Sequence, residues 1–156
     1  MPDFFHIGPP GYQVGNVIQP GNWGYEALAF HPRGRRALQE ERDATKLIWE
    51  AALEAARLVR FPEAVSRLDC VFACFGEGEA RAFRDRFRPD HKIYRVELVD
   101  PETPVTIGDY AAIAEAEPGP YVEAAARMAA RYWNAAQPRF PEALIGGAVR
   151  VTARLE

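Results

Sequence analysis

The sequence is poor in the residues on which several common chemistries depend. Two cysteines, Cys70 and Cys74, occur among 156 residues, and no histidine lies near them in sequence. Neither a disulfide framework nor a structural zinc site is therefore expected, and we predict that both cysteines are small buried hydrophobic side chains. Ser66 is the only serine and has no G-x-S-x-G pattern around it, which argues against a serine hydrolase. A Walker-type phosphate loop and a G-x-G-x-x-G fingerprint are also missing.

Long apolar runs and a strong excess of positive charge are missing as well. No run approaches the roughly 18 residues of a membrane helix, and no charged-then-apolar leader opens the sequence. We therefore expect a soluble, cytoplasmic protein without a membrane partner. The formal net charge of -3 argues against a protein whose main task is to coat nucleic acid.

The composition and periodicity that are present indicate a globular α+β protein. Hydrophobic residues make up 48% and charged residues 26%, and the length fits one domain over 1–156. Apolar spacing predicts helices over 44–60, 78–87 and 121–136, and strands over 4–7, 68–75, 93–99, 143–145 and 149–155. Because helices and strands alternate without a regular βαβ order, a mixed α+β fold follows. The first and last helices are expected to be scaffold, with Leu47 and Met128 on their buried faces.

Three features rise above this background as candidates for chemistry. His6 ends a short strand and precedes a Gly-Pro turn, where glycines let a ligand approach the backbone. Glu142 follows Pro141 at the start of a strand, a position from which a carboxylate can point into a cleft. The strand over 68–75 carries Phe72 and Phe75, either of which offers a flat ring. Each feature also has a plainer interpretation: a histidine without a chemical role, a solvated carboxylate and ordinary core.

Taken in chain order, these segments resemble the ADP-ribosyltransferase superfamily, in particular its diphtheria-toxin-like and rifampin-modifying branch. The resemblance covers most of the chain. The sequence also resembles a small bacterial family of uncharacterised domains within that superfamily. It depends on short motifs: Phe5-His6, Val14-Gly15-Asn16-Val17-Ile18 with Gly21, the Val71–Phe75 strand, Tyr94-Arg95-Val96-Glu97, and Glu142 with Leu144, Ile145 and Val149–Val151.

The resemblance implies a fold, a substrate and a set of roles. The fold would be two small antiparallel sheets around an NAD cleft, with helices outside. NAD+ would break at its nicotinamide–ribose bond through an oxocarbenium-like state. His6 would bind a ribose hydroxyl, and the backbone of Ile7 or Gly8 would bind the nicotinamide amide. Phe72 or Phe75 would pack on the nicotinamide ring, and Tyr94 lies on a further strand of the cofactor site. Glu142 would hold the 2′-hydroxyl and stabilise the cationic ribose as the catalytic residue.

The departures from the family pattern leave the acceptor open. The stacking position that is normally Tyr is Phe here, and Phe140, two residues before Glu142, is neither Glu nor Gln, which disfavours arginine as the target. Two other interpretations stay open. One is a catalytically silent domain that binds NAD+, another nucleotide or a partner, through the cleft or the basic segment Arg33–Arg36. The other is an RNA 2′-phosphotransferase-like activity, for which Arg67 and Arg95 are the available cations.

Overall fold

The computed structural model describes residues 3–28 and 41–155. Seven strands form in that part of the chain: β1 (Phe4–Gly8), β2 (Val17–Ile18), β3 (Val71–Ala73), β4 (Lys92–Leu98), β5 (Val105–Asp109), β6 (Pro141–Ile145) and β7 (Val149–Arg154). The helices there are α1 (Asn22–Leu28), α2 (Glu41–Arg60), the short 3-10 helix η2 (Arg67–Asp69), α3 (Glu77–Phe87), α4 (Ala111–Ala114) and α5 (Tyr121–Trp133). The basic segment Arg33–Arg36 lies outside the described residues.

The strands form two antiparallel sheets. The first, sheet A, has the order β1-β4-β7-β2, and the second, sheet B, has the order β3-β6-β5. The sheets meet where Phe5 of β1 and Cys74, just after β3, exchange two backbone hydrogen bonds of 2.9 and 2.8 Å. The predicted α+β class, with two small antiparallel sheets and flanking helices, is confirmed.

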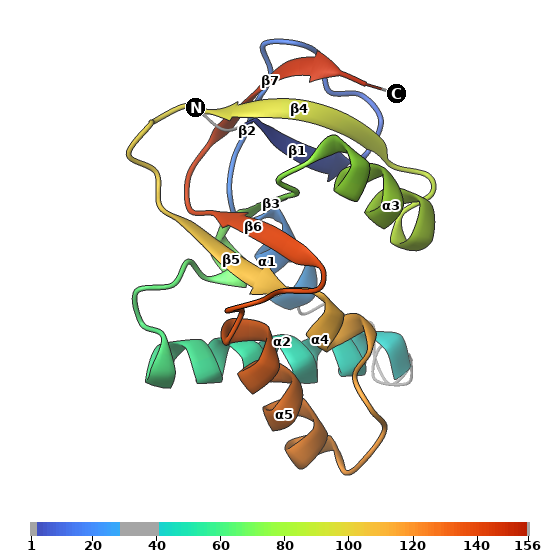
Figure 1. Cartoon of the computed structure of the whole chain (residues 1–156), viewed down its shortest axis with the longest axis vertical. Coiled ribbons are helices and arrows are strands. Elements are labelled where there is room, and N and C mark those ends of the chain that lie inside the picture. Colours follow the sequence, from blue (N-terminus) through green and yellow to red (C-terminus); the bar gives the residue numbers. More distant parts are fainter. Residues whose placement is uncertain (1–2, 29–40, 156) are drawn as a thin grey trace.

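Sheet B lies between sheet A and the helices α2 and α5 (Figure 1). Apolar side chains from both sheets fill the space between them: Phe4, Ile18, Val71, Ala73, Tyr94, Val96, Ala143, Ile145, Val149 and Val151. Along β6, Ala143 and Ile145 face sheet A, whereas Leu144 packs in the second cluster with the helices. Since side chains alternate between the faces of a strand, Glu142 lies on the helical side together with Leu144.

Helix α2 buries a different face from the one that its apolar spacing predicts. Leu47 is 47% exposed and Val59 is 82% exposed, whereas Leu53 and Glu50 are buried. The expectation that Leu47 belongs to the core is therefore wrong. The helix is turned so that the carboxylate of Glu50 points inward, where Arg67 binds it. Met128 of α5 is buried, as predicted.

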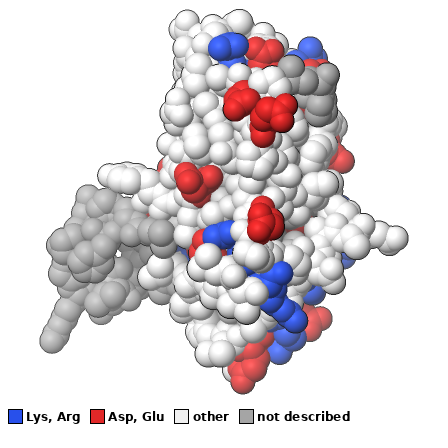
Figure 2. Space-filling view, turned by 90° about the vertical axis from the view of Figure 1, so that its left-hand side faces the viewer, with Lys and Arg blue, Asp and Glu red and all other residues white. Residues whose placement is uncertain are grey.

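Two expectations about composition also have structural counterparts. Cys70 and Cys74 are free and buried, as predicted. Among the helices formed by the described residues, none has both the length and the apolar character needed to cross a membrane. On the face drawn in Figure 2, acidic and basic side chains occur in small separate groups rather than as one continuous basic surface.

Candidate functional site

A cavity of about 850 Å³ opens beside the junction of the two sheets. Its volume lies within the roughly 300–1,000 Å³ typical of small-molecule sites. Aromatic side chains form much of its wall: Tyr12, Trp23, Tyr25, Trp49, Phe72, Phe83, Phe87 and Tyr110. The charged lining residues are Glu26, Lys46, Glu50, Arg67, Arg88 and Glu142. Rings and charges of both signs together suit a flat ligand that carries polar groups.

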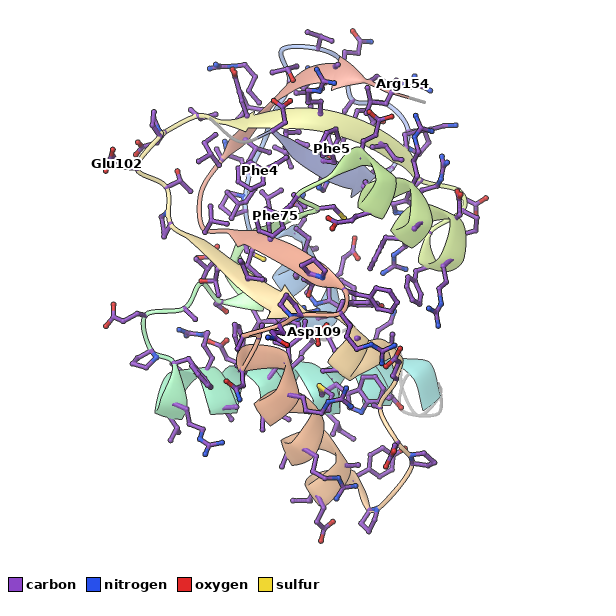
Figure 3. The ribbon with its side chains drawn as sticks, viewed as in Figure 1. Phe4, Phe5, Phe75, Glu102, Asp109 and Arg154 are labelled. Atoms are coloured by element: carbon purple, nitrogen blue, oxygen red, sulfur yellow. The ribbon has the colours of Figure 1, made fainter. Side chains whose placement is uncertain are left out.

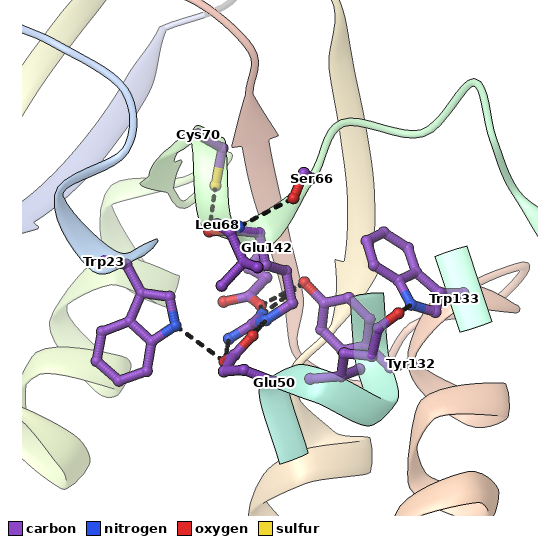
Figure 4. Close-up of polar contacts among 10 residues, drawn as sticks. Trp23, Glu50, Ser66, Leu68, Cys70, Tyr132, Trp133 and Glu142 are labelled. Atoms are coloured by element: carbon purple, nitrogen blue, oxygen red, sulfur yellow. Dashed lines mark hydrogen bonds and ion pairs between the residues drawn. The ribbon is translucent and has the colours of Figure 1, made fainter. Parts of the chain in front are cut away.

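The carboxylate of Glu142 is held at the wall of this cavity by two buried donors (Figure 4). Its Oε1 atom accepts a hydrogen bond of 2.6 Å from the Tyr132 hydroxyl and an ion-paired hydrogen bond from Nη1 of Arg67. Nη1 of Arg67 also donates to the Tyr132 hydroxyl at 2.7 Å. These three side chains are buried, so the position of Glu142 is fixed before any ligand binds.

A second carboxylate completes the cluster from helix α2. Glu50 accepts hydrogen bonds of 3.1 to 3.2 Å from Arg67 and one of 2.9 Å from the Trp23 indole. The Arg67 guanidinium also lies 4.8 Å from the ring centres of both Phe72 and Tyr132. Burial alone would lower the pKa of Arg67, but its neighbours Tyr132, Glu142 and Glu50 raise it well above its usual range. Two carboxylates around one guanidinium leave this buried cluster with a formal charge of one negative unit.

His6 stands where the two sheets meet. Its Nδ1 atom lies 2.8 Å from the carbonyl oxygen of Phe72 on β3. Burial lowers the pKa of His6, outweighing the raising effect of that carbonyl, so the ring is neutral at pH 7. A neutral ring that faces a carbonyl with Nδ1 must donate from Nδ1, and its Nε2 atom is then an acceptor.

The structure separates the predicted site residues into two groups. His6, Ile7, Phe72 and Glu142 line the cavity, whereas Gly8, Phe75 and Tyr94 do not.

Each residue of the second group has a different environment. A Cβ atom at Gly8 would stand 2.7 Å from Nε2 of His6, so Gly8 makes room for that ring. Phe75 packs against Phe4 in the core between the sheets (Figure 3). Tyr94 is fully buried, and its hydroxyl donates a hydrogen bond of 2.9 Å to the carbonyl of Pro9.

Several residues of the site have no clear signal in the sequence. Tyr132, Glu50 and Trp23 carry no motif, and the sequence suggests Arg67 only as a phosphate-binding cation. A weak signal exists for Glu50, because it precedes Leu53 by one helical turn and so shares the stripe that is buried. Tyr132 was hidden within the alanine-rich helix α5. Within the described residues, no cluster of His, Cys, Asp and Glu could hold a metal ion.

The fold and this cluster define an α+β protein with a buried acid–guanidinium site at an aromatic cavity. Residues 22–156 match the model of a family described as "Protein of unknown function (DUF2441)". The chain belongs to this family. Strand β1 with His6 precedes the matched segment. No curated protein matches the chain.

Proposed function

We propose that this protein transfers ADP-ribose from NAD+ to an acceptor, on an ADP-ribosyltransferase-like fold. The observation that carries the proposal is the fixed carboxylate of Glu142 at the wall of an aromatic cavity that also contains His6. The two antiparallel sheets with outer helices agree with the arrangement that the sequence resemblance implies.

The charge of the cluster supports bond cleavage of this kind. When the nicotinamide–ribose bond breaks, nicotinamide leaves with the bonding electron pair and positive charge develops on the ribose. Glu50 and Glu142 together exceed Arg67 by one negative charge, and the cluster is buried, so its field acts strongly on a cation nearby. Nη1 of Arg67 and the Tyr132 hydroxyl bind Oε1 of Glu142, and no partner of Oε2 occurs among the described residues. Oε2 is therefore the atom assigned to the ribose 2′-hydroxyl.

His6 and Phe72 supply the remaining contacts with NAD+, the ADP-ribose donor, in this proposal. Nε2 of the neutral His6 ring accepts a hydrogen bond from a ribose hydroxyl, with its orientation fixed by Phe72. One face of the Phe72 ring is already covered by Arg67 at 4.8 Å, so nicotinamide would pack on the other face. The backbone of Ile7 lies at the same end of the cavity and is available to the nicotinamide amide.

The test compares Glu142→Gln with the parent in release of nicotinamide from NAD+. Glutamine keeps the shape and one hydrogen bond but removes the negative charge, and loss of such a contact typically slows a reaction by about 10²–10³. We expect the variant to bind NAD+ in calorimetry and to release nicotinamide at least about 10² more slowly.

The matched control is Glu97→Gln, a carboxylate on β4 that forms an exposed ion pair with Arg150. It should release nicotinamide as the parent does. Equal turnover by Glu142→Gln and the parent would contradict the catalytic role of Glu142.

A catalytically silent NAD+-binding domain is the second candidate. The observation that favours it is the double engagement of Oε1 of Glu142 by Arg67 and Tyr132, which compensates part of the carboxylate charge. This candidate predicts tight NAD+ binding by the parent without any nicotinamide release. An RNA 2′-phosphotransferase activity, which would require phosphorylated RNA, has weaker support. Arg67 is engaged by two carboxylates, and Arg95 is outside the cavity lining.

A further inference from the structure

A cluster of three rings forms part of the cavity wall away from His6. Phe83 and Phe87 come from α3, and Tyr110 directly follows β5. Their ring centres are 4.8 to 5.2 Å apart, in tilted and edge-on arrangements. All three line the same cavity as Glu142.

Packing of the core explains only part of this cluster. Phe83 contacts the small core cluster below α3, whereas Phe87 and Tyr110 belong to none of the core clusters found among the described residues. The backbone of Tyr110 is nevertheless well fixed, because its N–H donates to the carbonyl of Phe140 at 2.9 Å and its carbonyl accepts from Ile113 and Ala114. Its hydroxyl has no partner within the described part of the chain. A rigid ring with an unused hydroxyl at a cavity wall is available to a ligand.

The strand register places this cluster beside the proposed catalytic carboxylate. Gly108 pairs with Glu142 and Asp109 pairs with Pro141 across β5 and β6, so Tyr110 stands at the edge where Glu142 enters the cavity. Burial raises the pKa of Tyr110, and the charge of Glu142 raises it further, so the phenol keeps its proton and is a hydrogen-bond donor at neutral pH. The contacts with NAD+, the ADP-ribose donor, are assigned to His6 and Phe72, on β1 and β3.

The charges near the three rings indicate which acceptor they suit. The Arg86 guanidinium lies 4.9 Å from the ring centre of Phe87 and 5.7 Å from that of Phe140, and Arg88 lines the cavity nearby. The charge of Glu142 acts on Tyr110 as well, so charges of both signs lie near the rings and neither sign favours a charged acceptor there. A neutral aromatic ring, in contrast, gains contact with the three rings at no electrostatic cost.

We infer that Phe83, Phe87 and Tyr110 form the acceptor subsite, and that the acceptor is a free planar aromatic compound with a hydroxyl nucleophile. This inference rests on the proposed function. In the transfer step the acceptor oxygen forms a bond to C1′ of the ribose, and nicotinamide leaves with the electron pair of the broken bond. The hydroxyl proton passes to solvent water.

The experiment uses 4-methylumbelliferone as the aromatic probe and agmatine as a guanidinium probe. Equilibrium binding of each probe is measured by calorimetry, with and without NAD+, for the parent, Phe87→Ala and Tyr110→Phe. The control is Tyr121→Phe, which alters an exposed tyrosine on α5. Transfer is measured separately as the mass gain of the probe, and donor cleavage as nicotinamide release in the absence of any probe.

We expect the aromatic probe to bind the parent and to bind Phe87→Ala about tenfold more weakly, because one stacking ring is lost. Tyr110→Phe should weaken binding less, and Tyr121→Phe should not change it. NAD+ affinity and probe-free nicotinamide release should stay at the parent level in Tyr121→Phe, and in Phe87→Ala and Tyr110→Phe the affinity for NAD+ should fall by less than the affinity for the probe. Melting temperatures near that of the parent would show that Phe87→Ala and Tyr110→Phe are folded.

Any of these binding results would overturn the inference: no binding of the aromatic probe to the parent, unchanged binding to Phe87→Ala, tighter binding of agmatine, or a matching loss of NAD+ affinity in Phe87→Ala. A loss of NAD+ affinity in Phe87→Ala would mean that the rings bind NAD+ rather than the acceptor. Competition by a single-stranded DNA oligonucleotide at the same site would also contradict a free small acceptor. If the proposed function alone fails, nicotinamide release is absent in every variant while aromatic binding still depends on Phe87.

Discussion

Gly108 of β5 lies directly against the phenol ring of Tyr132 of α5. A Cβ atom at Gly108 would stand 2.2 Å from both Cζ and the hydroxyl oxygen of Tyr132, which no real packing allows. Because Gly108 pairs with Glu142 across the sheet, the missing side chain leaves the space through which the Tyr132 hydroxyl reaches Oε1 of Glu142. The position of the carboxylate therefore depends on a glycine that has no functional group.

Replacing that glycine should damage both the fold and the site. We expect Gly108→Ala to cost about 1–3 kcal/mol of unfolding free energy, the usual range for overpacking in a core. Displacement of Tyr132 should also slow nicotinamide release by about 10², as misplacement of a catalytic group does. Urea unfolding and the release assay measure the two effects. Gly78→Ala is the control, since a Cβ there meets nothing within 4 Å. A Gly108→Ala protein as stable and active as the parent would contradict the packing argument.

Two side chains that the sequence pattern treats alike should respond differently to truncation. Met128 is 3% exposed, so Met128→Ala should cost about 2–5 kcal/mol through lost burial and the cavity left behind. Leu47 is 47% exposed, and Leu47→Ala should stay within about 0.5 kcal/mol of the parent. Chemical denaturation of both variants tests this difference, and similar losses would show that α2 is oriented differently.

His6 should make the protein less stable in mild acid. The pKa of His6 is lowered in the folded state by burial, whereas in the unfolded chain it stays near the ordinary histidine value of about 6.5. Below pH 6.5 the unfolded state therefore binds a proton that the folded state does not, and stability falls as the pH drops. The contribution cannot exceed about 1.4 kcal/mol per pH unit. Urea unfolding between pH 7.5 and 5.5 should show a steeper loss for the parent than for His6→Asn. Parallel pH profiles for the two proteins would mean that the pKa of His6 is the same in the folded and unfolded states.

The two thiols should be unreactive in the folded protein. Burial raises the pKa of Cys74 to about 12 and raises that of Cys70 further. Since the thiolate is the reactive form, Ellman's reagent at pH 8 should modify neither cysteine in the native state and both in urea. Rapid modification of the native protein would show that the cavity next to both residues exposes them.

The sequence predicted β1, β4, β6, β7, α2, α3 and α5 because their signals are local. It did not predict β5, α1 or α4, and the strand expected over 68–75 is only β3, because the residues before it form the 3-10 helix η2. The alternation over 93–99, which lies in β4 (Lys92–Leu98), and the apolar spacing of α5 are visible without any tertiary contact. The acidic partner of Arg67 on α2 could not be predicted in the same way, because Glu50 breaks the apolar pattern of its helix and is explained only by a residue 17 positions later. The prediction of the buried face of α2 was wrong for that reason. The apolar spacing includes Leu47 and Val59 but takes no account of a buried charged side chain.

The assignment of rings followed the same division between local and distant information. Sequence alone offered Phe72 and Phe75 equally, because both belong to one short apolar run. Alternation along the strand and its pairing with β6 send Phe72 toward the helices, whereas Phe75 packs with the core between the sheets. Tyr110 lies in no predicted element, and its neighbours Phe83 and Phe87 are more than 20 residues away in sequence.

The candidate site lies across the junction of the two sheets. His6 belongs to one sheet and Glu142 to the other, and three backbone-directed hydrogen bonds cross between β1 and the β3 segment: two between Phe5 and Cys74, and one from His6 to Phe72. The hydrogen bond that selects the tautomer of His6 is thus one of the three that hold the two sheets in register. Nδ1 of His6 therefore both orients the imidazole and links the two sheets. A ligand that displaces the imidazole would also displace the sheets relative to each other at this junction.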